Sequence, residues 1–125
     1  EAEVIEFFRG EYFGDILMNL KRTGGEFAAQ ALKKISLASP LAMAATIEMI
    51  HRVRGLDDIK PALEMEYRFT YRAAEQGDFI EGIRALVIDK DKTPKWQHSL
   101  TDSLLPAASA MLRPLGVHSL DLTET

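Results

Sequence analysis

Cysteine is missing from all 125 residues of the sequence. Its absence excludes disulfide bonds, thiol catalysis and the zinc or iron–sulfur sites that depend on cysteine ligands. Long apolar runs are missing too: the longest weakly polar stretch, residues 41–47, is far shorter than the roughly 18–20 residues that a membrane-spanning helix needs. No basic-then-apolar segment typical of a signal peptide opens the sequence. We therefore expect a soluble, intracellular protein without a membrane partner, and since residue 1 is Glu, we expect a piece of a longer chain.

Neither sign of charge dominates the sequence. Nineteen acidic residues against 15 basic ones give a net charge of −4, and no run of basic residues is longer than Lys33-Lys34. Because nucleic-acid-binding domains usually carry a basic patch, we do not expect a nucleic-acid partner. The hydrophobic content of 46% and the charged content of 27% are those of an ordinary folded domain, so disorder is not expected either.

The common phosphate-binding and catalytic motifs are also absent. The sequence contains no GxGxxG, GxxxxGK[ST], GxSxG or HExxH pattern. His51, His98 and His118 do not stand at the spacing of metal ligands, and His51 beside Arg52 is typical of a solvated histidine at a helix end. We therefore predict neither a catalytic residue nor a metal ligand in this chain.

What the sequence does contain is helical periodicity interrupted by Gly and Pro. It predicts a single all-α unit of five to six short antiparallel helices, without a sheet of any size. The expected helices span about residues 12–22, 26–36, 40–54, 57–76 and 79–88, with a less regular stretch at 100–112.

Each expected helix carries an apolar stripe that we predict to face the core. In the first helix the stripe contains Phe13 and Leu20, and in the third it contains Met43 and Ile50. The stripe of the fourth helix is Ile59, Leu63, Tyr67, Thr70, Tyr71 and Ala74. If the chain is a detached segment, we expect some aromatic residues near its start to be exposed, namely Phe7, Phe8 or Phe13.

The sequence predicts specific roles for several charged residues. Asp57 and Asp58 precede an apolar helical stripe, which favours capping over acid–base chemistry. Asp78 is expected to cap the fifth helix. Glu66 lies near the stripe of the fourth helix, where a buried carboxylate would need a partner, and Arg84 is the candidate. A surface position for Glu66 is the open alternative.

A charged loop over residues 89–95 ends at Trp96, the one tryptophan of the sequence. We expect Trp96 to pin this loop onto the helices. Lys90, Lys92 and Lys95 could attract a phosphate-bearing ligand, although a solvated loop is the ordinary interpretation of such a charge run.

Four sequence segments together resemble the C-terminal signature of the 3-hydroxyisobutyryl-CoA hydrolases of the crotonase (enoyl-CoA hydratase/isomerase) family. They are residues 65–68 (MEYR), 77–85 (GDFIEGIRA), 88–91 (IDKD) and 94–96 (PKW). With the similar spacing of the segments around residues 27–40, the resemblance covers about residues 12–96. The combination of segments is specific, whereas each piece alone is weak.

The resemblance implies that this chain is the C-terminal helical part of a crotonase-like protein and lacks the N-terminal core that holds the oxyanion hole. In the family, such helices lie against the core, cover the substrate pocket and contribute to subunit association. It implies an intact protein that hydrolyses an acyl-CoA thioester in valine catabolism, in the mitochondrial matrix or the bacterial cytoplasm. An enoyl-CoA hydratase or isomerase as the parent, or a stand-alone helical interaction module without catalysis, are the alternatives.

The resemblance also bears on coenzyme A contacts. In wider relatives an aromatic residue and a Lys shortly after a Glu-Gly pair approach the CoA moiety. Here Leu86 stands at the aromatic position, and Lys90 is displaced by one residue from the expected position of Asp89. Lys90 and Lys95 are therefore the candidate contacts for CoA phosphates, with acyl-CoA as a substrate and no further cofactor required.

Overall fold

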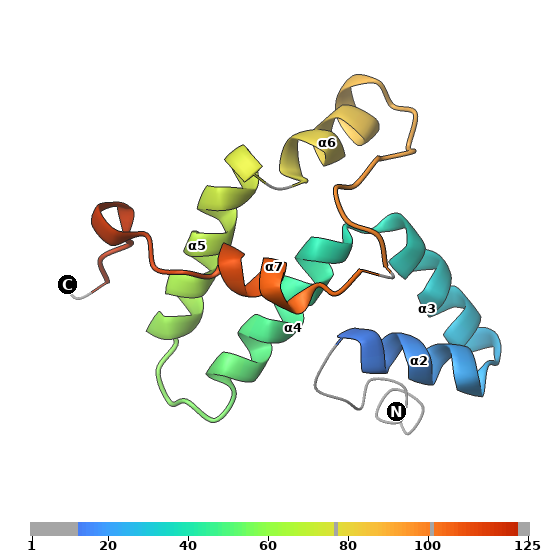
Figure 1. Ribbon diagram of the computed structural model, residues 1–125, viewed down its shortest axis with the longest axis horizontal. Coiled ribbons are helices and arrows are strands. Elements are labelled where there is room, and N and C mark those ends of the chain that lie inside the picture. Colours follow the sequence, from blue (N-terminus) through green and yellow to red (C-terminus); the bar gives the residue numbers. More distant parts are fainter. Residues whose placement is uncertain (1–12, 77, 101, 123–125) are drawn as a thin grey trace.

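The computed structural model describes residues 13–76, 78–100 and 102–122, and within these ranges it contains helices and no strand. The predicted all-α fold is confirmed. Figure 1 shows the helices in chain order. They are α2 (Phe13–Thr23), α3 (Glu26–Leu37), α4 (Pro40–Val53), α5 (Lys60–Gln76), α6 (Phe79–Ile83), the π-helical turn η1 (Arg84–Ile88), α7 (Leu105–Met111) and the 3-10 turn η2 (Gly116–His118).

The helix ends follow local signals in the sequence. Gly24 and Gly25 have φ angles of 72° and 96°, which disfavour residues with a Cβ atom, and they separate α2 from α3. The Ser39 hydroxyl accepts a hydrogen bond from the Ala42 backbone N–H at 3.2 Å, and Pro40 fills the first helical position of α4. These boundaries agree with the predicted ones to within one or two residues.

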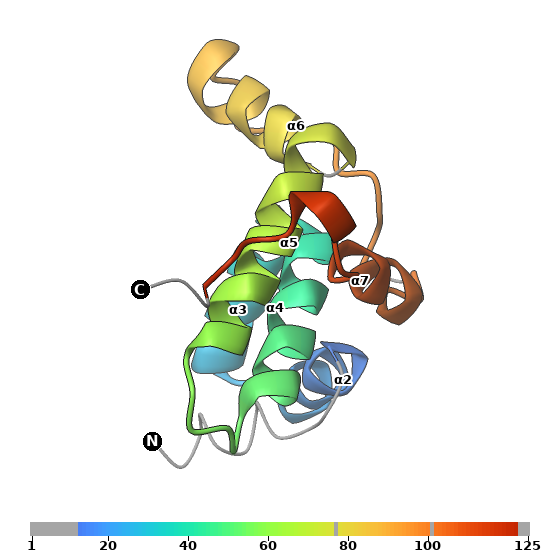
Figure 2. The same ribbon diagram turned by 90° about the vertical axis from the view of Figure 1, so that its left-hand side faces the viewer.

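The core forms around α4, which contacts α2, α5 and α7. Ala44, Ala45 and Ala108 are buried there, and their small side chains let α4 and α7 approach closely. Phe13 and Leu17 of α2 close the same cluster. Figures 1 and 2 show α4 in the middle of the molecule, with α5 and the α2–α3 pair on different sides of it.

The end of α7 is held by α5. Arg72 donates hydrogen bonds to the carbonyl oxygens of Met111, Arg113 and Pro114, and Arg68 donates to that of Leu112. Because the last carbonyl groups of a helix have no partner within the helix, these two arginines satisfy acceptors that would otherwise depend on water. Arg72 and Arg68 thus bind the C-terminal part of the described chain to the body of the protein.

The buried face of α5 differs from the predicted one. Ile59 and Leu63, just before and within this helix, are 69% and 39% exposed, whereas Met65 is only 6% exposed and Phe69 packs into the core. The predicted stripe is therefore wrong. α5 carries apolar residues on two faces, and α4 and α7 cover the face that contains Phe69, not the predicted face. In α4, similarly, Ile50 is exposed while Ala44 and Ala45 are buried.

The predictions for the last helix and for Phe13 have different outcomes. The last helix is shorter than the predicted stretch of residues 100–112, since α7 begins at Leu105, where Pro106 fits the first turn. Phe13 is buried, which confirms its predicted place on the core-facing stripe of the first helix. It is therefore not an exposed aromatic residue of a detached segment, and Phe7 and Phe8 lie outside the described residues. Among the described helices, none combines the length and apolar character needed to cross a bilayer.

Candidate ligand-contact site

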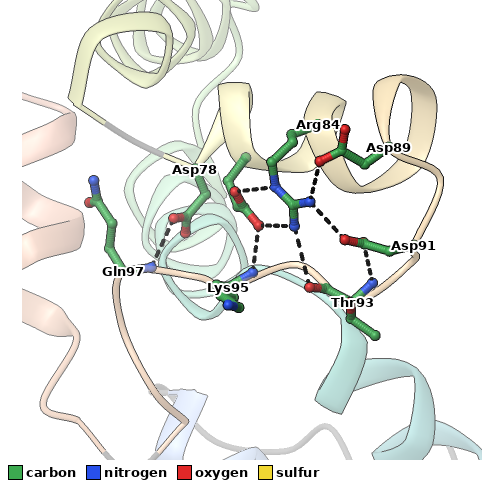
Figure 3. A network of polar contacts seen from close by, with 8 residues as sticks. Asp78, Arg84, Asp89, Asp91, Thr93, Lys95 and Gln97 are labelled. Carbon is green, nitrogen blue, oxygen red and sulfur yellow. Dashed lines mark hydrogen bonds and ion pairs between the residues drawn. The ribbon is translucent and has the colours of Figure 1, made fainter.

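The charged loop is organised around Arg84, at the start of the η1 turn (Figure 3). The guanidinium group donates from Nε and Nη2 to the two carboxylate oxygens of Glu81, at 2.9 and 2.7 Å. Its Nη1 donates to Asp89 at 2.8 Å and to Asp91 at 2.7 Å, and its Nη2 also reaches the Thr93 carbonyl oxygen at 3.4 Å. One arginine thus binds three carboxylates with the forked geometry that suits its planar group.

These contacts shift the titration of the groups involved. Hydrogen bonds from Arg84 and from the Lys95 backbone N–H lower the pKa of Glu81 from its ordinary value of 4.5 to about 2. The pKa of Asp91 is also lowered, by hydrogen bonds from Arg84 and from the Thr93 backbone N–H. The carboxylates raise the pKa of Arg84, with Glu81 as the largest cause. The loop is therefore tied together by fully ionised groups at neutral pH.

The predicted pair between Glu66 and Arg84 is wrong. Glu66 is exposed on α5, which leaves the alternative of a surface carboxylate. The partners of Arg84 lie within ten residues of it in the chain, because the α6–η1 segment folds its own loop back over the guanidinium group. The sequence did hold a signal for this arrangement: acidic residues stand three before and five and seven after Arg84.

Asp78 has a different role from the predicted helix cap. It is 8% exposed and makes no side-chain hydrogen bond to the first turn of α6. Instead its carboxylate accepts hydrogen bonds from the Ser39 hydroxyl at 2.7 Å and from the Gln97 backbone N–H at 3.0 Å. It therefore joins the start of α4 to the segment that follows the loop. Asp58 does cap as predicted, since it accepts from the Lys60 backbone N–H at 3.0 Å.

The lysines of the loop stand on a backbone that is fixed by hydrogen bonds. The Lys92 N–H donates to the Ala85 carbonyl oxygen at 3.0 Å, and the Lys95 N–H donates to Glu81 at 2.7 Å. Lys90 and Lys92 have φ angles of 56° and 57°, in the left-handed region that non-glycine residues rarely adopt. The side chains of Lys90, Lys92 and Lys95 are exposed, and none has an ion pair with another described residue.

Trp96 packs against α6, as expected for a residue that pins the loop. A Cβ atom at Gly82 would lie 3.6 Å from the Trp96 ring, so the indole sits directly over this glycine. The expectation for His51 is wrong: both of its ring nitrogens are covered by protein atoms and have no hydrogen-bond partner among the described residues. No group of three or more His, Asp or Glu within the described ranges is arranged to hold a metal ion.

An apolar groove of about 570 Å³ lies between α6–η1 and the body of the protein. Phe69 and Ala73 of α5, Leu86 of η1 and Trp96 contribute to its walls, and Lys92 also lines it. The groove has the size and apolar lining of a site that takes an apolar group. Lys92 of the charged loop thus lies at the edge of an apolar surface.

Apart from single exposed apolar residues such as Met18 and Ile50, two groups of large apolar side chains are exposed. One is the α5 face with Ile59, Leu63 and Tyr67, and the other is the α6–η1 segment, where Leu86 is 65% exposed. In the α6–η1 segment the further exposed apolar residues are Phe79, Ile80, Val87 and Ile88. Figures 1 and 2 show that this segment projects from the rest of the molecule. Exposed apolar surface of this kind is typical of sites that contact another protein surface.

Curated proteins similar to this chain include mitochondrial 3-hydroxyisobutyryl-CoA hydrolases. The protein from Rattus norvegicus is 40% identical over 82 residues, which are 66% of this chain and 21% of that protein. The protein from Gallus gallus is 29% identical over 116 residues, which are 92% of this chain and 30% of that protein. The chain thus spans less than a third of the length of these relatives.

Solved structures show the same relationship. An enoyl-CoA hydratase from Rhodobacter sphaeroides 2.4.1 is 42% identical with a TM-score of 0.89, over 96% of this chain and 36% of that one. A carnitinyl-CoA dehydratase from Mycobacterium thermoresistibile is 26% identical with a TM-score of 0.82, over 99% of this chain and 36% of that one. The family model for enoyl-CoA hydratase/isomerase matches residues 1–110. The chain therefore belongs to the enoyl-CoA hydratase/isomerase (crotonase) family.

Proposed function

We propose that this chain is the C-terminal helical lid and packing segment of a 3-hydroxyisobutyryl-CoA hydrolase-like protein. The complete protein would hydrolyse an acyl-CoA thioester in valine catabolism. The observation that carries the proposal is the exposed apolar surface of α5 and α6–η1, in a chain that spans about a fifth of relatives with that name.

The exposed apolar side chains explain why the segment needs a larger partner. Removing a Leu, Ile or Phe side chain from water stabilises an assembly by roughly 1.5–3 kcal/mol. Several such side chains lie on α6–η1, which has little contact with the body of the chain. The partner that we assign to these surfaces is the N-terminal crotonase core of the same protein, with a second subunit as a further contact in an oligomer.

The chemistry is assigned to that core rather than to this chain. The described residues contain no cluster suited to a metal ion, and the carboxylates with lowered pKa values are engaged by Arg84. A carboxylate held ionised by an arginine is a poor general acid or base near neutral pH. The chain alone is therefore expected to be inactive.

Lys90 and Lys95 are the proposed contacts for the phosphates of CoA. Both are exposed, both lie on a loop whose backbone is fixed, and neither is neutralised by a described carboxylate. An unpaired ammonium group is suited to a phosphate because it supplies both charge and hydrogen-bond donors.

A hydratase or isomerase is the second candidate for the complete protein. It is favoured by the solved structure from Rhodobacter sphaeroides 2.4.1, which is described as an enoyl-CoA hydratase and is 42% identical. The proposed location is the mitochondrial matrix, since the curated relatives are named as mitochondrial, or the bacterial cytoplasm. A stand-alone interaction module would keep the fold without any partner core.

A complementation assay separates these proposals. The Rattus norvegicus relative, shortened by the fifth of its length that this chain matches, would be mixed with this chain and with 3-hydroxyisobutyryl-CoA, and release of the CoA thiol would be followed. We expect turnover from the mixture and none from either part. Turnover by this chain alone would contradict the proposal. A matching mixture would contain the Rhodobacter sphaeroides 2.4.1 hydratase, shortened by the part that this chain matches, with crotonyl-CoA. Recovery of hydration in that mixture, without recovery of hydrolysis in the first, would favour the second candidate.

A further inference from the structure

The loop after η1 alternates in charge, which raises the question of which groups pair. In the order Asp89, Lys90, Asp91, Lys92, each ammonium group has a carboxylate on a neighbouring residue. In an unrestrained chain, such neighbouring charges attract one another, and the carboxylates largely offset the attraction of the ammonium groups for an approaching anion. The structure shows another pairing, because both aspartates bind Arg84 and the two lysines have no ion pair among the described residues.

The backbone conformation is consistent with this separation. Lys90 and Lys92 both have positive φ angles, a conformation that is unfavourable for residues with a Cβ atom. The strain is concentrated where Asp89 and Asp91 turn toward the same guanidinium group. Such a conformation persists only where surrounding contacts determine it, and Arg84 supplies contacts on both sides of each strained lysine.

Arg84 therefore orders the charged groups of the loop, and it does not contact a ligand itself. Its donors are used by Glu81, Asp89, Asp91 and the Thr93 carbonyl group. We propose that Arg84 is a positioning residue that keeps the carboxylates of Asp89 and Asp91 away from Lys90 and Lys92, so that both lysines are presented to an anionic phosphate group. Lys92, which also lines the apolar groove, thereby joins Lys90 and Lys95 as a proposed phosphate contact.

The identity of the ligand rests on the proposed function, whereas the role of Arg84 in ordering the loop does not. A ligand that suits the two features together is amphipathic: a phosphate group for the lysines and an apolar part for the groove beside Lys92. Arg84 serves better than a lysine would, because the ammonium group of a lysine cannot form the bidentate fork seen with Glu81.

The binding test uses adenosine 3′,5′-bisphosphate as the probe and calorimetry on the full chain. We expect about tenfold weaker binding for both Arg84→Met and Arg84→Lys, and no change for the control Arg52→Met, which removes a simple surface ion pair with Glu48. Wild-type affinity in Arg84→Lys would mean that only the charge matters and would overturn the positioning role.

A rescue experiment distinguishes positioning from a general loss of structure. Adding Asp89→Asn and Asp91→Asn to Arg84→Met removes the carboxylates that would otherwise neutralise the lysines, so binding should return to within about threefold of wild type. The charge-matched control adds Glu66→Gln and Glu75→Gln, two exposed positions on α5, and should not restore binding. Equal recovery in both, or recovery in neither, would contradict the proposal.

Limited trypsin digestion tests the same role without a ligand. Cleavage after Lys90 and Lys92, relative to cleavage after Lys33 and Lys34, should rise about tenfold in Arg84→Lys, since proteases act on opened segments. An unchanged ratio would overturn the role of Arg84. Failure of the wild-type chain to bind the bisphosphate would instead overturn the ligand role of the lysines, and with it that part of the proposed function.

Discussion

The body of the molecule and the α6–η1 segment are held together in different ways. In the body, α4 packs against α2, α5 and α7 through buried apolar side chains such as Leu17 and Ala108. In the α6–η1 segment the apolar side chains are largely exposed, and its loop is ordered by Arg84 and its carboxylate partners. This difference supports the proposal that the segment is covered by a partner, whereas the body carries its own apolar core.

The largest expected effect lies in the body. Leu20 is fully buried, so Leu20→Ala should lower the free energy of unfolding by about 2–5 kcal/mol through lost burial and a residual cavity. Denaturation by urea, followed by circular dichroism, measures this change. Met18→Ala on the same helix, at a 62% exposed position, should stay within about 0.5 kcal/mol of wild type. Equal losses at both positions would contradict the description of the core.

A smaller effect is expected where α5 holds α7. Arg72→Met leaves three carbonyl oxygens without their charged donor and should destabilise the body by about 1.5–3 kcal/mol. Thermal unfolding of this variant beside Arg52→Met provides the measurement and its control, because Arg52 makes only a surface pair with Glu48. If the two variants unfolded at the same temperature, the contacts of Arg72 would contribute nothing measurable.

Acid pH should open the loop of the α6–η1 segment while the body of the protein stays folded. The folded loop lowers the pKa values of Glu81 and Asp91 below their ordinary values of 4.5 and 3.8. Their contribution to stability is therefore complete above about pH 5 and is lost as the pH falls toward the value of about 2 for Glu81. Amide hydrogen exchange should show the loop opening in this range while Leu20 and its neighbours stay protected. Simultaneous opening of both regions would remove the distinction.

The smallest expected effect concerns the contact between Trp96 and α6. Gly82→Ala places a methyl group at ordinary van der Waals distance from the indole, 3.6 Å, and improves the helix propensity of α6. The free energy of opening this segment should be unchanged or up to about 1 kcal/mol higher in the variant. The Trp96 fluorescence should shift to shorter wavelength. A shift to longer wavelength would show that the methyl group displaces the ring.

Helix positions were predictable from the sequence because their ends carry strong local signals. Gly24-Gly25 and Ser39-Pro40 mark boundaries by backbone conformation and capping, which depend on nearest neighbours. The buried face of α5 was not predictable, because Leu63 and Met65 lie on different faces and both are apolar. Only the packing of α4 and α7 decides between them.

The candidate site was predictable in part. The sequence predicts the charged loop that carries Lys90 and Lys95, and the contact of these lysines with CoA stays a prediction. The partners of Arg84 were not predicted, because Glu66 on the preceding helix was the expected partner, whereas the structure has Glu81, Asp89 and Asp91 in that place. The π-helical turn of η1, in which the Asp89 N–H donates to the Arg84 carbonyl oxygen at 2.7 Å, had no clear signature in the sequence.

We propose that the exposed apolar faces of α5 and α6–η1 bind a partner core and do not contribute to the fold of the chain itself. The most direct measurement is the complementation assay with Leu63→Asp, a substitution on the exposed face of α5. We expect the thermal unfolding temperature of the variant chain to stay close to that of the wild type, while thioester hydrolysis by the mixture is lost. Undiminished hydrolysis by a variant that folds normally would contradict the claim.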